Sequence, residues 1–385
     1  MTANPGPLAG VRVLDLTSVI MGPYATQILA DQGADTIVVE PRGGDTNRLM
    51  GAGPHPELSG TSLNLMRNKR SVSIDLKTDE GQAAVRRLVS TCDVVVATYR
   101  PAALQRMGLS YEDVRTIRPD IVYCQGQGFA LDSPRSDEPA YDDVVQAASG
   151  LSDLMNRMQG EPGLMPTILA DKVCGLFIAQ AVSAALYHRA RTGEGQHIEV
   201  PMVEAMRSFV LVEHGAGAIC EPPLAAPGYA RVLSPYRKPQ RTTDGWVEVL
   251  PYSPSQYQAL FREAGRADLA GDARVADRAS AIRNADSLYR DVAEVLATRT
   301  SAQWLDFCGR AEIPATAVVT LEEILAALPL AEHPVAGSYR LIPAAARFSA
   351  ARPPPARPAP LIGADTDEVL GSLTDQPPIP QRADP

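Results

Sequence analysis

Alternation of apolar, strand-like segments with helical segments in the first third of the chain restricts its fold more than any other feature. The apolar segments predict strands at residues 11–16, 35–40, 71–76, 93–98 and 121–126. Helices are predicted between them at residues 22–34, 78–92 and 110–120. Continuously apolar strands separated by helices are typical of a parallel sheet that is covered on both faces. We therefore predict an α/β fold with a Rossmann-like open sheet.

The 385-residue chain is too long for one ordinary hydrophobic core, so two domains are expected. Near Pro223 a segment rich in proline and polar residues separates a large domain at 1–222 from a small domain at 223–330. Within the small domain the pattern predicts a strand and then three helices, at residues 246–252, 255–265, 285–299 and 301–311. Residues 363–373 predict a short helix that docks back on the large domain, and a Pro-rich tail occupies 375–385.

Bulk charge and the start of the chain argue against nucleic-acid, membrane and secretory functions. The net charge is -9, which repels nucleic acid and anionic lipid surfaces. The first residues contain no basic region followed by a long apolar run, so no signal peptide is expected and the protein is predicted to be cytoplasmic. The most apolar run, residues 173–187, is shorter than a membrane span and is interpreted as a core helix.

Two common kinds of cofactor site are not expected from the motifs. The five cysteines include no C-x-x-C pair, and none of the five histidines is at ligand spacing from a cysteine. No metal site is therefore predicted, and the thiols are expected to be free and mostly buried. The turn after the first strand contains Gly22 alone in place of G-x-G-x-x-G, so a nicotinamide dinucleotide is not expected there.

Asp171 stands between two apolar segments, the second of which is 173–187, and has two interpretations. As a helix N-cap it would accept the free N–H groups of the helix that follows, which is the more common use of aspartate at such a position. As a reagent it would be a poorly hydrated carboxylate kept ionised by a helix N-terminus, and therefore a usable nucleophile. Asp142 and Asp143 follow Tyr141 and are likewise either caps or a second carboxylate near the first.

Basic residues gather at the ends of predicted strands. Arg42, Arg100 and Arg106 follow strands, at the edge where open parallel sheets bind ligands, so they are candidates for phosphate contacts. Lys69 and Arg70 precede a strand. For any one of these residues, the alternative is an ordinary solvated surface charge.

Six segments in a fixed order carry a family resemblance, among them "AYDDVVQAASG" and "TTDGWVEV". They lie at residues 7–45, 68–81, 99–114, 140–150, 170–205 and 242–249. In these segments the chain resembles the family III CoA-transferases, which include the formyl-CoA, carnitine and bile-acid CoA-transferases and have the α-methylacyl-CoA racemases as close relatives. The resemblance extends from about residue 7 to residue 373.

The resemblance implies a fold and a reaction that the pattern alone does not give. It implies a large Rossmann-like domain completed by residues 331–385, a small α+β domain, and two chains interlinked in a homodimer. The substrates implied are an acyl-CoA and a carboxylic acid, with no cofactor beyond coenzyme A. Asp171 matches the family nucleophile, which forms a mixed anhydride with the acyl group and then an aspartyl-CoA thioester. Asp142 matches a position where transferases of the formyl-CoA type carry a glutamate.

A further set of positions falls in segments that resemble the CoA-binding segments of the family. The resemblance implies CoA contacts from Val19, Met21, Arg42, Lys69, Arg70, Thr98, Tyr99, Arg106, Met107 and Tyr141.

At several positions this chain differs from individual subfamilies, and these differences indicate which subfamily it resembles least. Racemases carry a histidine base where this chain has Tyr141, and a tyrosine is a poor base at neutral pH. Racemases also use a glutamate soon after the "DGW" strand, whereas "LPYSPSQYQALF" has no carboxylate. Formyl-CoA transferases have a glutamine where this chain has Ile20, and they have a glycine run that is absent between Glu221 and Trp246.

These departures favour a CoA-transferase for acids other than formate and oxalate, with acceptor specificity expected near residues 218–257. Two alternatives stay open. One is a racemase or epimerase in which Asp171 is a proton-transfer base. The other is a CoA-binding homologue without turnover.

Overall fold

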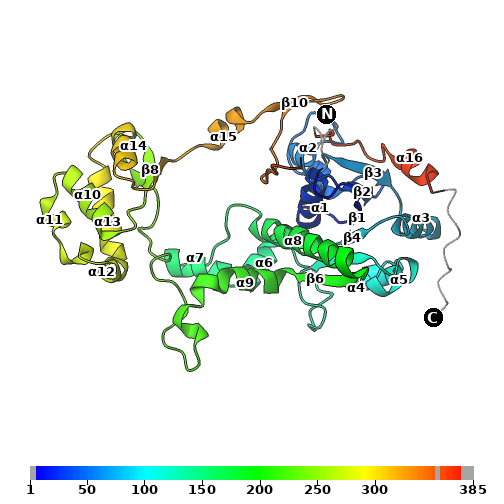
Figure 1. The fold of residues 1–385 in the computed structure, drawn as a ribbon, viewed down its shortest axis with the longest axis horizontal. Coiled ribbons are helices and arrows are strands. Elements are labelled where there is room, and N and C mark those ends of the chain that lie inside the picture. The colour runs from blue at the N-terminus through cyan, green and yellow to red at the C-terminus, as the bar shows by residue number, and fades with distance from the viewer. Residues whose placement is uncertain (1–5, 352–355, 374–385) are drawn as a thin grey trace. The chain divides into compact units, whose positions relative to one another are not determined.

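The computed structural model describes residues 6–351 and 356–373. The predicted Pro-rich tail at 375–385 lies outside the described residues. The chain folds as a mixed α/β protein, in which strands and helices alternate through the first third and helices dominate later parts (Figure 1).

Contacts within the chain divide it into two compact units. The second unit contains Ser152–Gly163 and Val210–Ala327, and the first unit contains the rest of the chain. The sequence predicts a small domain at residues 223–330. The second unit overlaps most of that range, begins earlier, and takes in a separate short segment.

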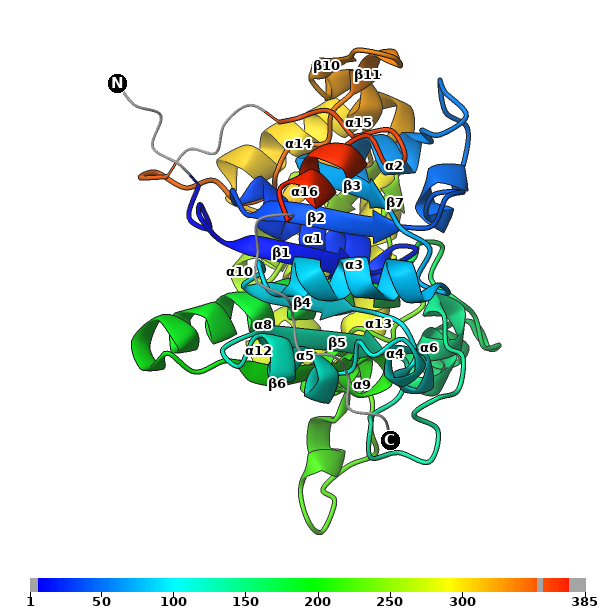
Figure 2. The same cartoon turned by 90° about the vertical axis from the view of Figure 1, so that its right-hand side faces the viewer.

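Six parallel strands form the central sheet of the first unit, in the order β3-β2-β1-β4-β5-β6 (Figure 2). The strands are β1 Arg12–Leu16, β2 Asp35–Glu40, β3 Lys69–Ser73, β4 Val94–Ala97, β5 Val122–Gln127 and β6 Gln196–Pro201. The predicted parallel sheet is thus confirmed. Strand order reverses between β1 and β4, and open sheets of this kind bind ligands beyond the carboxyl ends of the strands at such a point.

Two strands differ from the sequence prediction. The strand predicted at 71–76 instead occupies Lys69–Ser73, because the ammonium of Lys69 is neutralised in the core by Asp15 and a lysine can therefore open the strand. Strand β6 was not predicted, because it is the edge strand of the sheet and carries polar residues such as His197 and Glu199 in place of a continuous apolar run.

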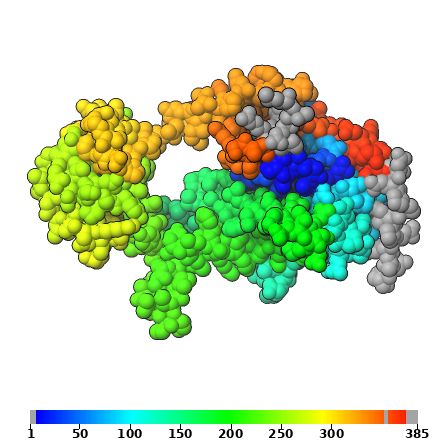
Figure 3. Space-filling view, viewed as in Figure 1, coloured from blue at the N-terminus to red at the C-terminus, as the bar shows by residue number. Residues whose placement is uncertain are grey.

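Helices α1 Met21–Asp31 and α8 Leu169–Thr192 cover one face of the sheet. They approach closely at Gly175, where an added Cβ would lie 2.7 Å from the carbonyl oxygen of Met21. By length and composition α8 is apolar enough to cross a membrane, a test that the core helix of a soluble protein also passes. Its inner side packs into the core through residues such as Ile178, whereas Leu176 and Phe177 are exposed. Figure 3 shows this green stretch of the chain at the surface of the first unit.

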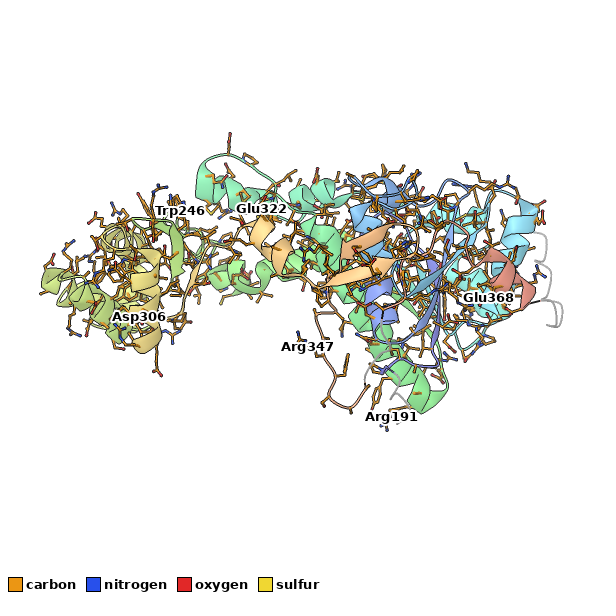
Figure 4. The ribbon with its side chains drawn as sticks, turned by 90° about the horizontal axis from the view of Figure 1, so that it is seen from above. Arg191, Trp246, Asp306, Glu322, Arg347 and Glu368 are labelled. Carbon is orange, nitrogen blue, oxygen red and sulfur yellow. The ribbon has the colours of Figure 1, made fainter. Side chains whose placement is uncertain are left out.

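The opposite face of the sheet is covered by α3 Asp79–Val89, α5 Tyr111–Ile117 and α16 Thr366–Gly371. Thr78 caps α3, because its Oγ1 accepts a hydrogen bond from the backbone N–H of Gly81 at 3.1 Å. The predicted docking of the C-terminal helix is confirmed. Val369 and Leu373 pack into the core beneath the sheet, and Glu368 of α16 (labelled in Figure 4) lies 3.5 Å from Arg70.

The remaining elements complete the first unit. They are η1 Thr46–Leu49, α2 Gly60–Leu65, α4 Pro101–Arg106, α6 Asp142–Ala148, β10 Leu330–His333 and β11 Gly337–Arg340. Strands β10 and β11 pair antiparallel, and Tyr339 and Ala359 pack against Val38 and Leu58. Residues beyond 331 therefore contribute to the core of the first unit. Two helices cross the division between units, α7 Leu151–Gln159 and α9 Met202–His214.

The second unit has a small antiparallel sheet and several helices around its own core. Its strands, in the order β7-β8-β9, are β7 Gln240–Arg241, β8 Trp246–Val249 and β9 Ala315–Ala317. Its helices are η2 Ala216–Ile219, α10 Pro254–Glu263, α11 Ala267–Ala270, η3 Ala273–Val275, α12 Arg278–Arg283, α13 Ala285–Leu296, α14 Ser301–Arg310 and α15 Leu321–Ala327. Phe261, Leu288 and Trp304 are central to the core, and the Trp304 indole N–H donates to the carbonyl of Leu296 at 2.9 Å. The strand and the three helices predicted in this region are confirmed.

Candidate active site

The turn that follows β1 has a strained backbone that two neighbouring segments hold in place. Val19 has φ 68°, a left-handed conformation that is unusual for a β-branched residue and costs on the order of 1–3 kcal/mol. The backbone N–H of Val19 donates to Asp45 Oδ1 at 3.2 Å, and that of Ser18 donates to Thr98 Oγ1 at 3.2 Å. The side chains of Ser18 and Asp45 are also hydrogen-bonded. This turn lies between β1 and β4, where the strand order reverses.

Gly22 explains why a single glycine is sufficient in this turn. A Cβ at Gly22 would lie 2.2 Å from the Cβ of Thr17, so the chain can pass from strand to helix this tightly only without a side chain there. The helix that follows begins at Met21, one residue before the predicted start. Because α1 directly follows the carboxyl end of β1, the first N–H groups of α1 lie at the carboxyl edge of the sheet.

Asp171 does not cap its own helix. Helix α8 begins at Leu169, its N-cap residue is Ile168, and no side chain caps it from that position. The Asp171 side chain, 7% exposed, interacts instead with the backbone N–H of Met21, the first residue of α1. A carboxylate at a helix N-terminus is stabilised by the free N–H groups and the helix dipole. The interpretation of Asp171 as the cap of α8 is therefore wrong, and the carboxylate is left available at the start of a different helix.

Asp142 supplies the cap that α8 lacks. Its Oδ1 accepts a hydrogen bond from the backbone N–H of Asp171 at 3.0 Å, so Asp142 satisfies a free N–H in the first turn of α8. Gln146 holds the other oxygen, because its Nε2 donates to Asp142 Oδ2 at 2.5 Å. The Gln146 side-chain oxygen in turn accepts from the backbone N–H of Met165 at 2.9 Å. Asp142 is thus fixed in one orientation beside Asp171.

Gln146 is a site residue that the sequence analysis missed. It is fully buried and has both ends of its amide engaged. Its signal in the sequence was its spacing, because it follows Asp142 by four residues and so shares a helix face with it. A glutamine carries no charge, so in the sequence nothing marks Gln146 as a candidate for catalysis.

The environment of Asp171 makes its carboxylate poorly hydrated but ionised at neutral pH. Burial, with the negative charge of Asp142 as the second cause, raises the pKa of Asp171 to about 6, against a smaller opposing effect of the Met21 N–H. A carboxylate of this kind is more nucleophilic than a fully hydrated one and still deprotonated at pH 7. Cys174, one turn further along α8, is not a competing nucleophile, because burial raises the pKa of its thiol to about 12.

The predicted CoA-binding positions fall into two groups. The first group lies at the carboxyl edge of the sheet or follows it directly. Val19 and Met21 belong to the turn after β1, and Thr98 contacts that turn through its hydroxyl group. Arg42 follows β2 and Tyr99 follows β4. Arg106 is the last residue of α4, Met107 comes next, and Tyr141 immediately precedes α6. Of these residues, Arg42, Arg106 and Tyr141 are exposed.

Lys69 and Arg70 form the second group, and the structure does not bring them to this edge. They are the first residues of β3 and so stand at the amino ends of the strands. Lys69 is 0% exposed, and its ammonium donates to Asp15 Oδ2 at 3.0 Å, Thr26 Oγ1 at 2.7 Å and the Pro23 carbonyl at 2.9 Å. Arg70 pairs with Asp35 at 2.5 Å. Since all three donors of Lys69 are used within the core, it has no surface to offer to a phosphate, and the expectation that it binds CoA is corrected to a structural role.

Within the described ranges 6–351 and 356–373, no cluster of three or more histidine, cysteine, aspartate or glutamate side chains is arranged to hold a metal ion. The five cysteines are free thiols, of which Cys220 is exposed and the other four are buried. The groups gathered at this edge of the sheet include the carboxylates of Asp142 and Asp171 and the backbone N–H of Met21 at the start of α1.

Comparisons with known proteins identify the family of this chain. The family model described as CoA-transferase family III matches residues 8–366. A succinate–glutarate CoA-transferase from Agrobacterium fabrum is 34% identical over 83% of this chain and 82% of its own length. A probable fatty acyl-CoA transferase, Rv3272 of Mycobacterium tuberculosis, is 33% identical over 79% of this chain and 80% of its own length. Among solved structures, a CAIB/BAIF family protein from Brucella suis superposes with a TM-score of 0.81 at 27% identity, covering 96% of this chain and all of that one. The chain belongs to the CoA-transferase family III.

Proposed function

We propose that this enzyme exchanges CoA between an acyl-CoA donor and a carboxylic acid acceptor, with Asp171 as the covalent nucleophile. The observation that carries the proposal is the position of the Asp171 carboxylate. It is buried, has a pKa of about 6 because of burial and the charge of Asp142, and lies at the N-terminus of α1. Family membership gives the overall reaction, and this carboxylate gives the chain a group able to carry the acyl and CoA groups in turn.

The proposed reaction conserves an activated carbonyl at every step. The Asp171 carboxylate attacks the thioester carbonyl of the donor, the C–S bond breaks, and CoA leaves as the thiolate with Asp171 in a mixed anhydride. The thiolate then attacks the aspartyl carbonyl, which releases the donor acid and forms an aspartyl-CoA thioester. The acceptor carboxylate attacks that thioester, the C–S bond breaks, and the thiolate leaves with the acceptor joined to Asp171 in a second mixed anhydride. The thiolate then attacks the acceptor carbonyl, which yields the new acyl-CoA and releases the Asp171 carboxylate.

Water must be excluded while the anhydride exists, because water would hydrolyse it. The burial of Asp171 and of Asp142 supports that requirement. We propose that Asp142 keeps Asp171 in place through the backbone hydrogen bond at 3.0 Å, and that its fixed charge keeps the nucleophile reactive. For CoA itself, we propose contacts from Val19, Met21, Arg42, Thr98, Tyr99, Arg106, Met107 and Tyr141.

We also propose that the enzyme works as an interlinked homodimer in the cytoplasm, with no cofactor beyond coenzyme A. Exposed apolar side chains support association of copies. They occur on the outer side of α8, at Leu176 and Phe177, and around α15, at Val319, Leu321 and Ile324. Light scattering coupled to size exclusion tests this, and a monomer at micromolar concentration would contradict it.

Intact-protein mass spectrometry after incubation with a panel of acyl-CoAs, with and without hydroxylamine, tests the mechanism. The expected result is an adduct that maps to Asp171 and is absent from Asp171→Ala. A racemase would instead exchange the Cα proton of a 2-methylacyl-CoA with deuterium in the absence of an acceptor acid. Such exchange without any adduct would overturn the proposal.

A further inference from the structure

Two arginines of the second unit converge on one aromatic ring. The guanidinium carbon of Arg231 lies 5.2 Å from the ring centroid of Tyr252, and that of Arg278 lies 4.9 Å from the same centroid. Arg278 also donates from Nη2 to the Tyr252 hydroxyl at 3.0 Å, and Arg231 donates from Nε to the Tyr289 hydroxyl at 2.9 Å. Arg278 is thus held by the hydroxyl of Tyr252, and Arg231 by those of Tyr289 and Tyr229. A guanidinium group has five N–H donors, so donors remain on each for a ligand.

No carboxylate neutralises either guanidinium. All residues of the second unit are described, and in it neither Arg231 nor Arg278 forms a salt bridge. Other arginines of the same unit do, such as Arg274 with Asp272 at 2.9 Å and Arg299 with Glu263 at 2.6 Å. Two positive groups gathered at one ring repel each other, and an anion between them would remove that repulsion.

These groups line a small hollow of about 30 Å³, which is room for a group the size of a carboxylate and not for a whole acid molecule. Its polar lining consists of the two guanidinium groups and three phenols, Tyr229, Tyr252 and Tyr257. Burial raises the pKa of Tyr257 to about 12, so this phenol is protonated at neutral pH and able to donate. The rest of the lining is apolar, with Pro251 and Ile282 among it. The hollow therefore offers donors and a short apolar wall, and no carboxylate lines it.

We propose that this hollow binds the carboxylate group of a small organic acid, and that it serves as a recognition site for the acid substrate. A carboxylate is an acceptor-only group that matches the planar guanidinium donors, and its size fits the hollow, so the hydrocarbon part of the acid would lie outside it. The link to an acid substrate rests on the proposed function, while the binding of a carboxylate by the hollow does not. Five of the nine residues that line the hollow, among them Arg231, lie in the region 218–257, where acceptor specificity is expected.

Isothermal titration of the full-length protein, without any acyl-CoA, measures binding directly. The probes are glutarate and butyrate as carboxylates and inorganic phosphate as the competing anion. The variants are Arg231→Gln and Arg278→Gln, and the matched control is Arg283→Gln. Arg283 is an arginine on the same helix as Arg278, but its guanidinium bonds Ser280 and does not line the hollow.

The expected result is saturable carboxylate binding that either Gln variant weakens by about tenfold or more, while Arg283→Gln leaves it unchanged. Circular dichroism of each variant confirms that it is folded. Equal loss in all three variants, or no loss in the first two, would overturn the site. Absence of saturable binding in the unmodified chain would overturn it as well. Phosphate binding more tightly than both acids would overturn the choice of a carboxylate.

Steady-state kinetics separate this proposal from the proposed function. With an acyl-CoA that labels Asp171, both Gln variants should raise the KM of the acceptor acid and leave the KM of the donor and the yield of the adduct unchanged. If no acyl-CoA labels Asp171 while the hollow still binds carboxylates as described, the proposed function fails and the binding site stands. If labelling occurs and the acceptor KM does not change, the hollow has no role in recognition of the acid substrate.

Discussion

The carboxylate of Asp142 accepts the backbone N–H of Asp171 at 3.0 Å, so the two acids of the site are joined through a main-chain group and not through a shared proton. This arrangement separates their roles. Asp142 is fixed by Gln146 and by the start of α8, whereas the side chain of Asp171 points to the N-terminus of α1. The consequences are testable residue by residue.

Replacing Gln146 with Met should impair both stability and catalysis. Methionine has a similar length but no hydrogen bonds, so Asp142 Oδ2 and the Met165 N–H both lose a buried partner. We expect a loss of about 1–3 kcal/mol in the free energy of unfolding and a fall in kcat of about tenfold or more, with the KM of the acyl-CoA little changed. Urea denaturation and steady-state kinetics measure the two effects. An unchanged kcat in a destabilised variant would make Gln146 purely structural.

Asp142→Asn should shift the pH dependence of activity. In the unmodified enzyme, activity is expected to fall as pH drops through about 6, because Asp171 becomes protonated. The charge of Asp142 is the second cause of that raised pKa, so a neutral amide lowers the pKa of Asp171. The acid limb of the kcat/KM profile should therefore move to lower pH. A limb that stays in place, or moves upward, would show that Asp142 does not tune the nucleophile.

Asp171→Asn should abolish CoA exchange and stabilise the fold. The folded-state pKa of Asp171, about 6, lies above its ordinary value of 3.8, so the ionised carboxylate destabilises the folded state once pH exceeds about 6. The amide removes this cost, which is on the order of 3 kcal/mol above pH 6 and disappears below about pH 4. Thermal unfolding at pH 8 and at pH 4.5 should show a larger gain at the higher pH. An equal gain at both would contradict the desolvated, charged state of Asp171.

Gly175→Ala should disturb the contact between α1 and α8. The added Cβ would meet the Met21 carbonyl at 2.7 Å, and overpacking of this kind costs about 1–3 kcal/mol. Gly309 in α14 provides the control, because a Cβ there meets nothing within 4 Å and alanine should stabilise that helix slightly. Chemical denaturation of both variants makes the comparison. Equal stability of the two would mean that α1 and α8 can separate without cost.

Lys69 and Arg106 should separate folding from CoA binding. Lys69→Met leaves Asp15 buried without a counter-charge, which costs about 3–5 kcal/mol. Arg106→Ala, at an exposed position, should leave stability unchanged and weaken CoA binding. Calorimetry of CoA binding and thermal unfolding distinguish the two. Loss of CoA affinity in a folded Lys69→Met protein would restore Lys69 to the binding site.

The parallel sheet of the first unit could be predicted from the sequence because most of its strands are buried on both faces and are therefore uniformly apolar. The same reasoning failed at β6, whose edge position permits residues such as His197, and at Lys69, whose charge is neutralised by Asp15, a partner 54 positions away in sequence. Short-range patterns contain no information on such a pairing. The pattern left Asp171 and Asp142 as either helix caps or a pair of carboxylates, and the resemblance favoured the pair.

The cap of α8 shows a further limit of sequence reasoning. An aspartate near the start of an apolar helix is normally taken as the cap of that helix, and at Asp171 this interpretation was wrong. The capping carboxylate comes from Asp142, on another helix. The N-cap position of α8 itself, where a hydroxyl or carboxylate side chain is usual, holds Ile168. Only the three-dimensional arrangement of α6 and α8 reveals the exchange.

The anchoring of the Asp171 main chain by a second carboxylate limits what must move during turnover. In the proposed reaction, acylation and thioester formation change only the end of the Asp171 side chain, while its N–H remains bound to an acid that is never consumed. In that reaction the bulky acyl and CoA groups are therefore carried by the Asp171 side chain, which rotates about χ1 and χ2 while the Asp171 backbone stays fixed. The enzyme can pass a reactive carbonyl from one partner to the next without moving a helix.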